Sequence, residues 1–341
     1  LLMDNKLQDI VLNAPIAQNP IFVRHEKYDE CVTNIIPSYE DADSWAAKLR
    51  LQSGRPLDEA NPVLDTELNV GKIRSRVAAI TQPLSPSGLA YAFRRHRDKP
   101  WTLPLYINNK MINSFGAGLL SFMIDGARTL LVAGTRSSGK TSLLNALMLE
   151  VMPKYRMIVI EDTLELSVDA LRKIGYDILR MKVRSALVEG TSEVEASEGI
   201  RTSLRLGDSA LIVGEVRSSE ARALYEAMRV GALANVVAGT IHGDSPYGVF
   251  DRVVNDLDVT PTSFKATDLI IITNPVKTAD GMHSRRRVIQ ITEVRKHWQK
   301  DPQEEGGFVD LMRYNVEKDE LEPTEELING DSEVIKNIAG R

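Results

Sequence analysis

The feature that most constrains the fold is the run Gly134-Thr-Arg-Ser-Ser-Gly-Lys-Thr141, which matches the pattern G-x-x-x-x-G-K-[ST]. An apolar run of strand length, 129–133, precedes it, and apolar residues at helical spacing follow it over 140–152. The glycines let the backbone curl so that successive N–H groups point at phosphate oxygens, and a helix that begins at the loop adds its positive dipole end. Strand, loop and helix together predict a phosphate-binding loop in an α/β nucleotide-binding domain.

The whole loop and the residue after it form the predicted contact set for a nucleoside triphosphate: Gly134, Thr135, Arg136, Ser137, Ser138, Gly139, Lys140, Thr141 and Ser142. Within this set, Lys140 is expected to neutralise the β- and γ-phosphates, and the Thr141 hydroxyl is expected to ligate Mg²⁺. The alternative is a chance match, which the flanking strand and helix disfavour. Such a loop identifies a nucleotide site but not a task, because kinases, GTPases and motors share it.

Composition excludes several classes of protein. The 341 residues include 43% hydrophobic and 26% charged residues, which is typical of folded chains and not of disordered ones. The single cysteine, Cys31, cannot form an intrachain disulfide, so a secreted disulfide scaffold is excluded. The net charge of −5 disfavours a protein that wraps nucleic acid, and we expect no nucleic-acid partner. No apolar run reaches the length of a membrane span, so we expect a membrane role only through a partner.

The hydrophobic pattern changes along the chain and predicts two domains. Residues 1–110 carry short alternating runs broken by Pro, Asn and Gly, and a helix is expected over 41–51. They indicate a smaller mixed α+β N-terminal domain that includes a polar linker near residues 94–101. Residues 111–341 alternate strand-length apolar runs with amphipathic helices, which predicts a mostly parallel sheet covered on both faces. The tail is expected to add strands near 286–294 and 308–316.

Carboxylates are expected at the ends of two further core strands. Glu161 and Asp162 follow the apolar run 157–160, and Glu215 follows the run 210–213. A carboxylate at the end of an apolar strand can polarise the attacking water or help to hold Mg²⁺. We therefore expect Glu215 to activate water and Glu161 to hold the metal with Thr141, although the two roles could be exchanged. The alternatives are that these acids cap the next turn, or that Glu215 forms a salt bridge with Arg217.

A histidine and three arginines complete the candidate site. His242 ends another predicted core strand in a Gly-Thr-Ile-His-Gly-Asp run. A lone histidine is more often structural, but the Gly and Thr around this one favour a sensor of the γ-phosphate. Phosphoryl transfer also needs a cation beyond Lys140 and the metal, and arginine is suited to that role. The candidates are Arg94 and Arg95, for which a solvated basic linker is the alternative, and Arg217 is a third.

In their order along the chain, these segments resemble the type II/type IV secretion ATPase superfamily. The loop corresponds to the family's Walker A motif, Ile-Glu161-Asp162-Thr to its Asp box, Ile-Val-Gly-Glu215-Val-Arg217 to its Walker B motif, and Gly-Thr-Ile-His242-Gly-Asp-Ser-Pro to its His box. The resemblance is strong over about 130–275 and weaker over 1–110. Within the superfamily the chain is most similar to archaeal GspE-like secretion ATPases, which lack a four-cysteine zinc module.

The resemblance implies a RecA-like domain, a homohexamer and Mg-ATP hydrolysis. It also implies a cytoplasmic protein held at the membrane by a polytopic inner-membrane platform protein of a secretion, pilus or archaellum system. One departure is that the family commonly has Arg-x-Arg-Pro-Asp before Walker B, whereas this chain has Arg205-Leu-Gly207-Asp-Ser. The role of the missing arginine would fall to Arg201, Arg205 or another residue, or hydrolysis would be impaired. Two other functions stay open: a RecA-fold nucleic-acid translocase, and a nucleotide-dependent scaffold with little turnover.

Overall fold

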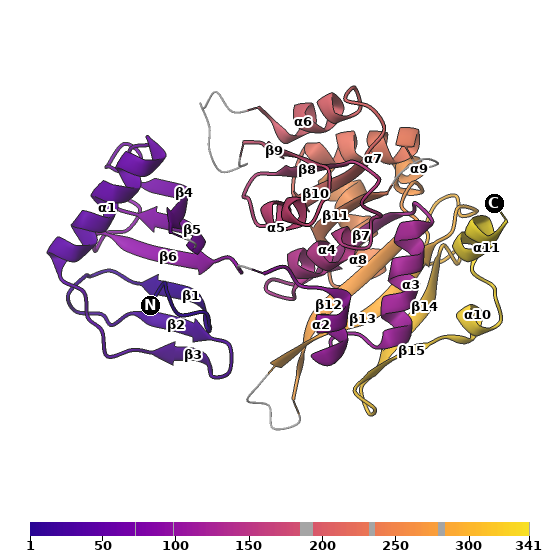
Figure 1. Cartoon of the computed structure of the whole chain (residues 1–341), viewed down its shortest axis with the longest axis horizontal. Coiled ribbons are helices and arrows are strands. Elements are labelled where there is room, and N and C mark those ends of the chain that lie inside the picture. Colours follow the sequence, from indigo (N-terminus) through magenta and orange to yellow (C-terminus); the bar gives the residue numbers. More distant parts are fainter. Residues whose placement is uncertain (72, 98, 185–193, 232–235, 279–283, 341) are drawn as a thin grey trace. The chain divides into compact units, whose positions relative to one another are not determined.

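The computed structural model describes residues 1–71, 73–97, 99–184, 194–231, 236–278 and 284–340. The chain divides into two compact units, Leu1–Lys99 and Pro100–Arg341. Each unit has a sheet of its own (Figure 1). Within the described residues, no helix combines the length and the apolar character that crossing a membrane would need.

The N-terminal unit is an antiparallel sheet with a helix packed on it. Its strands, in the order β3-β2-β1-β6-β5-β4, are β1 (Leu7–Leu12), β2 (Phe22–His25), β3 (Asp29–Val32), β4 (Val63–Val70), β5 (Ile73–Ile80) and β6 (Ala90–Arg95). Helix α1 (Tyr39–Ser53) begins at a capping box formed by Ser38 and Asp41. The hydroxyl of Tyr91 on β6 donates to the carbonyl of Ala42 at 2.7 Å, which fixes the helix to the sheet.

The second unit is built on a nine-stranded sheet with the order β15-β14-β13-β12-β7-β11-β10-β8-β9. The strands are β7 (Thr129–Gly134), β8 (Met157–Glu161), β9 (Ile178–Lys182), β10 (Ala210–Val216), β11 (Val237–His242), β12 (Leu269–Lys277), β13 (Ser284–Val294), β14 (Phe308–Asn315) and β15 (Glu320–Pro323). The strands from β12 to β9 pair in parallel, and β13, β14 and β15 form an antiparallel extension. The carboxyl ends of β7, β11, β10 and β8 therefore meet at one edge of the sheet.

Helices cover both faces of this sheet (Figure 1). They are α2 (Leu103–Asn108), α3 (Ser114–Asp125), α4 (Lys140–Met148), α5 (Val168–Lys173), α6 (Ala196–Ser203), α7 (Glu220–Gly231), α8 (Pro246–Asp251), the π-helix η1 (Arg252–Asp256), α9 (Pro261–Phe264), α10 (Glu325–Ile328) and α11 (Glu333–Ala339). Side chains along β7 alternate between the faces: Leu130 and Val132 join the core with α3 and α4, and Leu131 and Ala133 join the core with α7 and α8. This two-sided burial explains the continuous apolar runs of the sequence.

Most predicted elements of the second unit are confirmed. The two strands expected in the tail, near 286–294 and 308–316, correspond to β13 and β14. The helix expected over 140–152 ends earlier, at Met148, ahead of Pro153, which disfavours helical backbone before it. The pattern did not indicate β9, α5, β15 or α11, which are short and whose faces are defined by packing rather than by their own periodicity.

The segment 100–110 belongs to the second unit. The hydrophobic pattern predicts that it belongs to the N-terminal domain, with the boundary between 110 and 111, whereas the structure divides the chain between Lys99 and Pro100. The reason is α2, whose Leu103 and Tyr106 are buried in the core formed with α3 and α4. The aromatic ring of Trp101 packs edge-on against Tyr106, with ring centroids 5.3 Å apart, so the chain is already part of this core at residue 101.

Candidate nucleotide-binding site

The predicted phosphate-binding loop lies between the end of β7 and the start of α4, at the carboxyl edge of the sheet. The N-cap of α4 is Gly139, with a φ of 98°, and no side chain caps this helix. The left-handed backbone at this position suits glycine, and the first N–H groups of the helix are left without a side-chain acceptor. The loop therefore fits an anion such as a phosphate group.

Gly134 allows the loop to pass close to β12. A Cβ atom at this position would lie 2.0 Å from the carbonyl oxygen of Thr273 and 2.5 Å from Oγ of Ser138. The Ser138 hydroxyl lies 3.1 Å from Oγ1 of Thr273, which ties the loop to the neighbouring strand. A glycine is needed here because no side chain fits between the loop and β12.

Lys140 is folded back onto the loop. Its Nζ donates to the carbonyl oxygens of Gly134 at 3.1 Å and Thr135 at 3.0 Å, and it lies 3.4 Å from Nδ1 of His242. Only 8% of the residue is exposed, and burial lowers the pKa of the ammonium from its usual value. No carboxylate of the described residues is in direct contact with this ammonium beside the loop, which is the setting in which a phosphate oxygen would be bound strongly.

A chain of polar contacts joins Lys140 to two carboxylates. Nε2 of His242 lies 3.0 Å from Oε1 of Glu215, and Nη2 of Arg217 donates to Oε2 of the same carboxylate. Nη1 of Arg217 donates to Oδ2 of Asp162 at 3.2 Å. The carboxyl ends of β11, β10 and β8 supply these residues, so the sheet brings together the His box, Walker B and Asp box segments as the sequence predicts.

The electrostatics of this chain favour a neutral histidine and a charged carboxylate. Burial, followed by the charge of Lys140, lowers the pKa of His242. Burial would raise the pKa of Glu215, but the hydrogen bond and charge of Arg217, with His242 and Lys140, hold it below its usual value. A neutral imidazole with its proton on Nε2 can accept from Lys140 through Nδ1, which is the tautomer we assign. Nε2 lies close to Oε1 of Glu215, but this contact lacks the geometry of a hydrogen bond.

Glu161 and Asp162 have different surroundings although they are adjacent. Glu161 is only 2% exposed, and its Oε1 accepts from the N–H groups of Glu165 at 2.8 Å and Leu166 at 2.7 Å. Nε of Arg180 lies 3.6 Å from Oε2. Burial raises the pKa of Glu161 to about 7. This carboxylate therefore holds the turn after β8, as the capping alternative expects, while Asp162 carries the contact with Arg217.

Three side chains that the sequence did not indicate form hydrogen bonds with the backbone of the loop. The Tyr106 hydroxyl donates to the carbonyl of Gly139 at 3.2 Å, Nε of Arg286 donates to the carbonyl of Ser137 at 2.9 Å, and Oδ1 of Asn274 accepts from the N–H of Thr135 at 3.1 Å. They come from α2, β13 and β12. No local pattern marks them, because each reaches the loop from a distant part of the sequence.

The remaining predicted residues lie in two places. Thr141 and Ser142 are half-buried in the first turn of α4, and Arg136 is exposed in the loop. Arg94 and Arg95 lie on β6 of the N-terminal unit: Nε of Arg94 donates to Asp9 at 3.0 Å, and Arg95 donates to the carbonyl of Asp4 at 3.3 Å and to Asn5 at 2.5 Å. Their role toward ATP stays a prediction.

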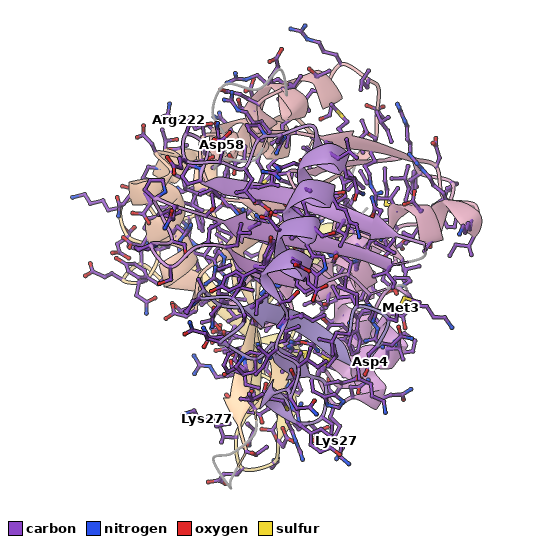
Figure 2. All side chains as sticks on the ribbon, turned by 90° about the vertical axis from the view of Figure 1, so that its left-hand side faces the viewer. Met3, Asp4, Lys27, Asp58, Arg222 and Lys277 are labelled. Carbon is purple, nitrogen blue, oxygen red and sulfur yellow. The ribbon has the colours of Figure 1, made fainter. Side chains whose placement is uncertain are left out.

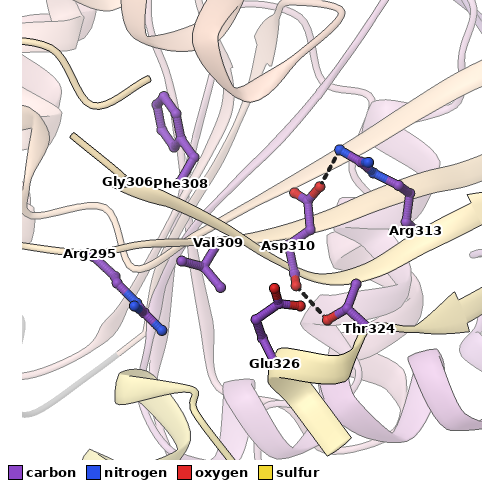
Figure 3. Close-up of a pocket in the computed structure, with 8 residues that line it drawn as sticks. All are labelled: Arg295, Gly306, Phe308, Val309, Asp310, Arg313, Thr324 and Glu326. Carbon is purple, nitrogen blue, oxygen red and sulfur yellow. Dashed lines mark hydrogen bonds and ion pairs between the residues drawn. The ribbon is translucent and has the colours of Figure 1, made fainter. Parts of the chain in front are cut away.

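A pocket with a volume of about 460 Å³ lies in a different part of the second unit (Figure 3). Its lining residues are Arg295, Gly306, Phe308, Val309, Asp310, Arg313, Thr324 and Glu326. The charged group of Arg313 pairs with Asp310 at 2.7 Å, and the Thr324 hydroxyl donates to the carbonyl of Asp310 at 2.6 Å. The pocket mixes both charge signs, and two of its charged residues, Asp310 and Arg313, pair with each other, so it does not resemble a phosphate site.

A family model described as "Type II/IV secretion system protein" matches residues 20–315. This match covers most of each unit and every segment of the polar chain described above. The chain belongs to this family. The superfamily predicted from the Walker A, Asp box, Walker B and His box segments is therefore confirmed, while the narrower archaeal GspE-like subgroup stays a prediction.

Relatives with lower coverage include proteins from both archaea and bacteria. An uncharacterised protein of Methanocaldococcus jannaschii is 33% identical over 236 residues, which is 67% of this chain and 31% of that protein. The conjugal transfer protein TrbB of Rhizobium radiobacter is 26% identical over 199 residues, which is 58% of this chain and 56% of that protein. The chain thus spans about a third of the first of these relatives and just over half of the second.

Solved structures of the ATPase DotB share the fold. The X-ray structure of the ATPase DotB from Legionella pneumophila has a TM-score of 0.56 and 16% identity, and the match covers 99% of this chain and 83% of that chain. DotB from Yersinia pseudotuberculosis has a TM-score of 0.60 and 14% identity, with 85% and 76% covered. The predicted fold class is thus confirmed: an α/β RecA-like domain with a phosphate-binding loop, preceded by a smaller mixed α+β domain.

Proposed function

We propose that this secretion-family chain binds and hydrolyses Mg-ATP and works as a homohexamer that powers secretion or pilus assembly through a membrane-embedded machine. The observation that carries the proposal is the chain of contacts from Lys140 through His242 and Glu215 to Arg217 and Asp162, beside the uncapped start of α4. A phosphate-binding cation, a carboxylate and a linking histidine at one sheet edge are the groups that transfer of a phosphoryl group to water requires.

The proposed roles follow from these contacts. Lys140 exchanges its two carbonyl contacts for phosphate oxygens when the nucleotide binds. Glu215 accepts the proton of the attacking water, and His242, placed between the two, senses whether the terminal phosphate is present. Arg217 holds Glu215 as an ion pair, and because a paired carboxylate is a weaker base, this pair has to loosen for turnover. Release of Glu215 from Arg217 is thus part of the proposed cycle.

The residues around the loop also fit a magnesium ion. Bound Mg²⁺ would supply positive charge to the phosphates during transfer. Thr141 in the first turn of α4 and Glu215 at the end of β10 offer the oxygen donors that this ion prefers. Glu161 is a poorer candidate than expected, because its carboxylate is occupied by the turn after β8. We assign Glu161 to positioning that turn and Asp162 to the polar chain.

The oligomer, the partner and the location are proposed from family membership. A homohexamer would allow Arg94 and Arg95 of one N-terminal unit to supply the additional cation to an ATP site. The partner would be a polytopic inner-membrane platform protein, which would hold this chain at the cytoplasmic face of the membrane. Conjugal transfer protein TrbB among the relatives supports work on a secretion or transfer machine.

The test compares Lys140→Ala with Lys173→Ala, an exposed lysine at the end of α5. Binding of Mg-ATP and steady-state phosphate release are measured for both variants and for the wild type. We expect Lys140→Ala to lose turnover and to bind ATP much more weakly, and Lys173→Ala to match the wild type. Unchanged affinity and rate in Lys140→Ala would remove the loop from the mechanism. If the wild type binds ATP without hydrolysing it, the nucleotide-dependent scaffold is favoured. If DNA stimulates hydrolysis, the nucleic-acid translocase is favoured.

A further inference from the structure

Arg252 is a partly buried arginine that the proposed site does not yet use. It is the first residue of η1, which directly continues α8. Helix α8 in turn follows the strand that ends at His242, after a short turn. Its Nε is buried and has no hydrogen-bond partner among the described residues. The carboxylate of the preceding Asp251 accepts instead from Asn255 at 2.7 Å. A buried charged donor without an acceptor is rare in native proteins and calls for an explanation.

Packing fixes the helix that carries Arg252 against the site. A Cβ atom at Gly243, the residue after His242, would lie 2.7 Å from Cγ2 of Val249 on α8, so helix and turn are in close contact. Val249 and Val253, on either side of Arg252 in sequence, are fully buried in the core between the sheet and the helices α7 and α8. The π-helical turn at Arg252 is a rare geometry that occurs frequently at functional sites.

The guanidinium of Arg252 is within electrostatic reach of the phosphate-binding groups. Burial is the main cause of the lowered pKa of Lys140 and of His242, and the charge of Arg252 lowers both further. Arg217, the other cation near these two residues, is already neutralised by Glu215 and Asp162. The charge of Glu165 offsets part of the charge of Lys140. Arg252 has no ion pair among the described residues, so it is the cation here that an anion would balance.

We propose that Arg252 binds the terminal phosphate of ATP in the same subunit, and so distinguishes ATP from ADP. The inference rests on the proposed ATP-binding function of the loop. Strand β11, which precedes Arg252, lies between β7 with the loop and β10 with Glu215. The terminal phosphate of a nucleotide held by the loop would extend toward Glu215, past the end of this strand at His242, and α8 and η1 follow from that same end. Arginine can pair two phosphate oxygens through its planar fork.

The experiment measures equilibrium binding of Mg-ADP and of a non-hydrolysable Mg-ATP analogue to the full chain. The variants are Arg252→Gln and Arg252→Lys, with Arg222→Gln as control. Arg222 is exposed on α7 (Figure 2). It pairs with Asp258. We expect Arg252→Gln to lower the affinity for the ATP analogue about 10- to 100-fold, as for loss of a charge-assisted hydrogen bond, and the affinity for ADP less than about 3-fold. Arg252→Lys should recover part of the difference, and Arg222→Gln should change neither affinity.

Each outcome decides the inference. Equal weakening of both nucleotides would show that Arg252 acts on the fold or on the shared phosphates, and unchanged affinities would show that it does not bind the nucleotide. In both cases binding by the wild type would leave the proposed function standing. Failure of the wild type to bind either nucleotide would overturn the proposed function and the inference with it. If Arg252→Gln does not fold, the ratio of the two affinities in Arg252→Lys decides the question.

Discussion

Adjacent acids at the end of β8 show how strongly local contacts decide a residue's role. Glu161 accepts two backbone hydrogen bonds and lies beside Arg180, whereas Asp162 pairs with Arg217. Both carboxylates could serve phosphoryl transfer by residue type alone. Their contacts assign Glu161 to the turn after β8 and leave Glu215 as the carboxylate that is joined to Lys140 through His242.

We predict opposite consequences for Glu215→Gln and Glu161→Gln. Glu215→Gln should still bind Mg-ATP but hydrolyse it at least ~10²-fold more slowly, within the usual contribution of a general base. Glu161→Gln should keep most of the activity and alter stability instead. Steady-state phosphate release measured for both variants tests the rates. Normal turnover in Glu215→Gln together with a dead Glu161→Gln would show that the two roles are exchanged.

The pH dependence of stability gives a second readout for Glu161. Its pKa in the folded chain, about 7, lies above the ordinary value of 4.5, so folding favours the protonated acid. Below about pH 4.5 the group is protonated in both states and does not lower the free energy of unfolding. As the pH rises from about 4.5 to about 7, the unfolded chain loses this proton more readily than the folded chain, so the free energy of unfolding falls. Glutamine resembles the protonated acid, so Glu161→Gln should gain up to about 3 kcal/mol over the wild type above pH 7. Denaturant unfolding at pH 5 and pH 8 measures this difference, and equal differences at both values would contradict it.

At the level of elements, the conformation of the loop between β7 and α4 requires a close approach to β12. We predict that Gly134→Ala abolishes nucleotide binding and costs about 1–3 kcal/mol or more, because its Cβ would overlap the Thr273 carbonyl oxygen at 2.0 Å. Gly118→Ala on α3 is the matched control. Gly118 is exposed and has open space around a Cβ atom, so alanine should stabilise the helix by about 0.5–1 kcal/mol. Thermal unfolding and ATP titration measure both effects, and retained ATP affinity in Gly134→Ala would contradict the proposed geometry.

The turn between α6 and β10 explains the departure from the family's arginine run. Gly207 has a φ of 91°, a left-handed conformation that side chains other than glycine adopt only with strain. No atom lies within 4 Å of a Cβ at this position, so the backbone conformation, and not a lack of space, disfavours a side chain here. An arginine at residue 207 would thus require a different turn, and the missing cation has to come from elsewhere. Arg252 and the N-terminal arginines are the residues proposed for it.

At the scale of the whole molecule, we predict that ATP hydrolysis depends on assembly. If Arg94 of an N-terminal unit completes the site, activity per subunit should rise with protein concentration as hexamers form. Arg94→Ala should lower turnover at least ~10-fold with little loss of stability, because its exposed pair with Asp9 is worth at most about 1 kcal/mol. Arg24→Ala, which breaks the similar pair with Asp29, is the control. Phosphate release and sedimentation are measured over a dilution series.

Two results would contradict this prediction. Constant activity per subunit across a dilution series in which hexamers dissociate would show that the site is complete in a single chain. Equal losses of activity in Arg94→Ala and Arg24→Ala would show that both arginines act through the stability of the N-terminal unit. In the first case Arg252 would be the leading candidate for the cation that completes the site.

The sequence by itself determined the parts of this protein that follow from local rules. The loop at 134–141 was readable because its backbone needs glycines and its function needs Lys140, and both requirements fall within one short segment. The strands before Glu161, Glu215 and His242 were readable because strands buried on both faces are continuously apolar. Parallel pairing then places their carboxyl ends at one edge, so the candidate site could be assembled before any coordinates.

The tertiary structure alone decided the contacts between segments far apart in the chain. Tyr106 and Arg286 brace the loop from α2 and β13, and no spacing in the sequence connects them with it. The assignment of Glu161 to a turn depended on how the chain leaves β8, and the position of Arg252 depended on how α8 packs against the turn after His242. Periodicity specifies which face of an element is buried, but it does not specify which distant side chain meets it there.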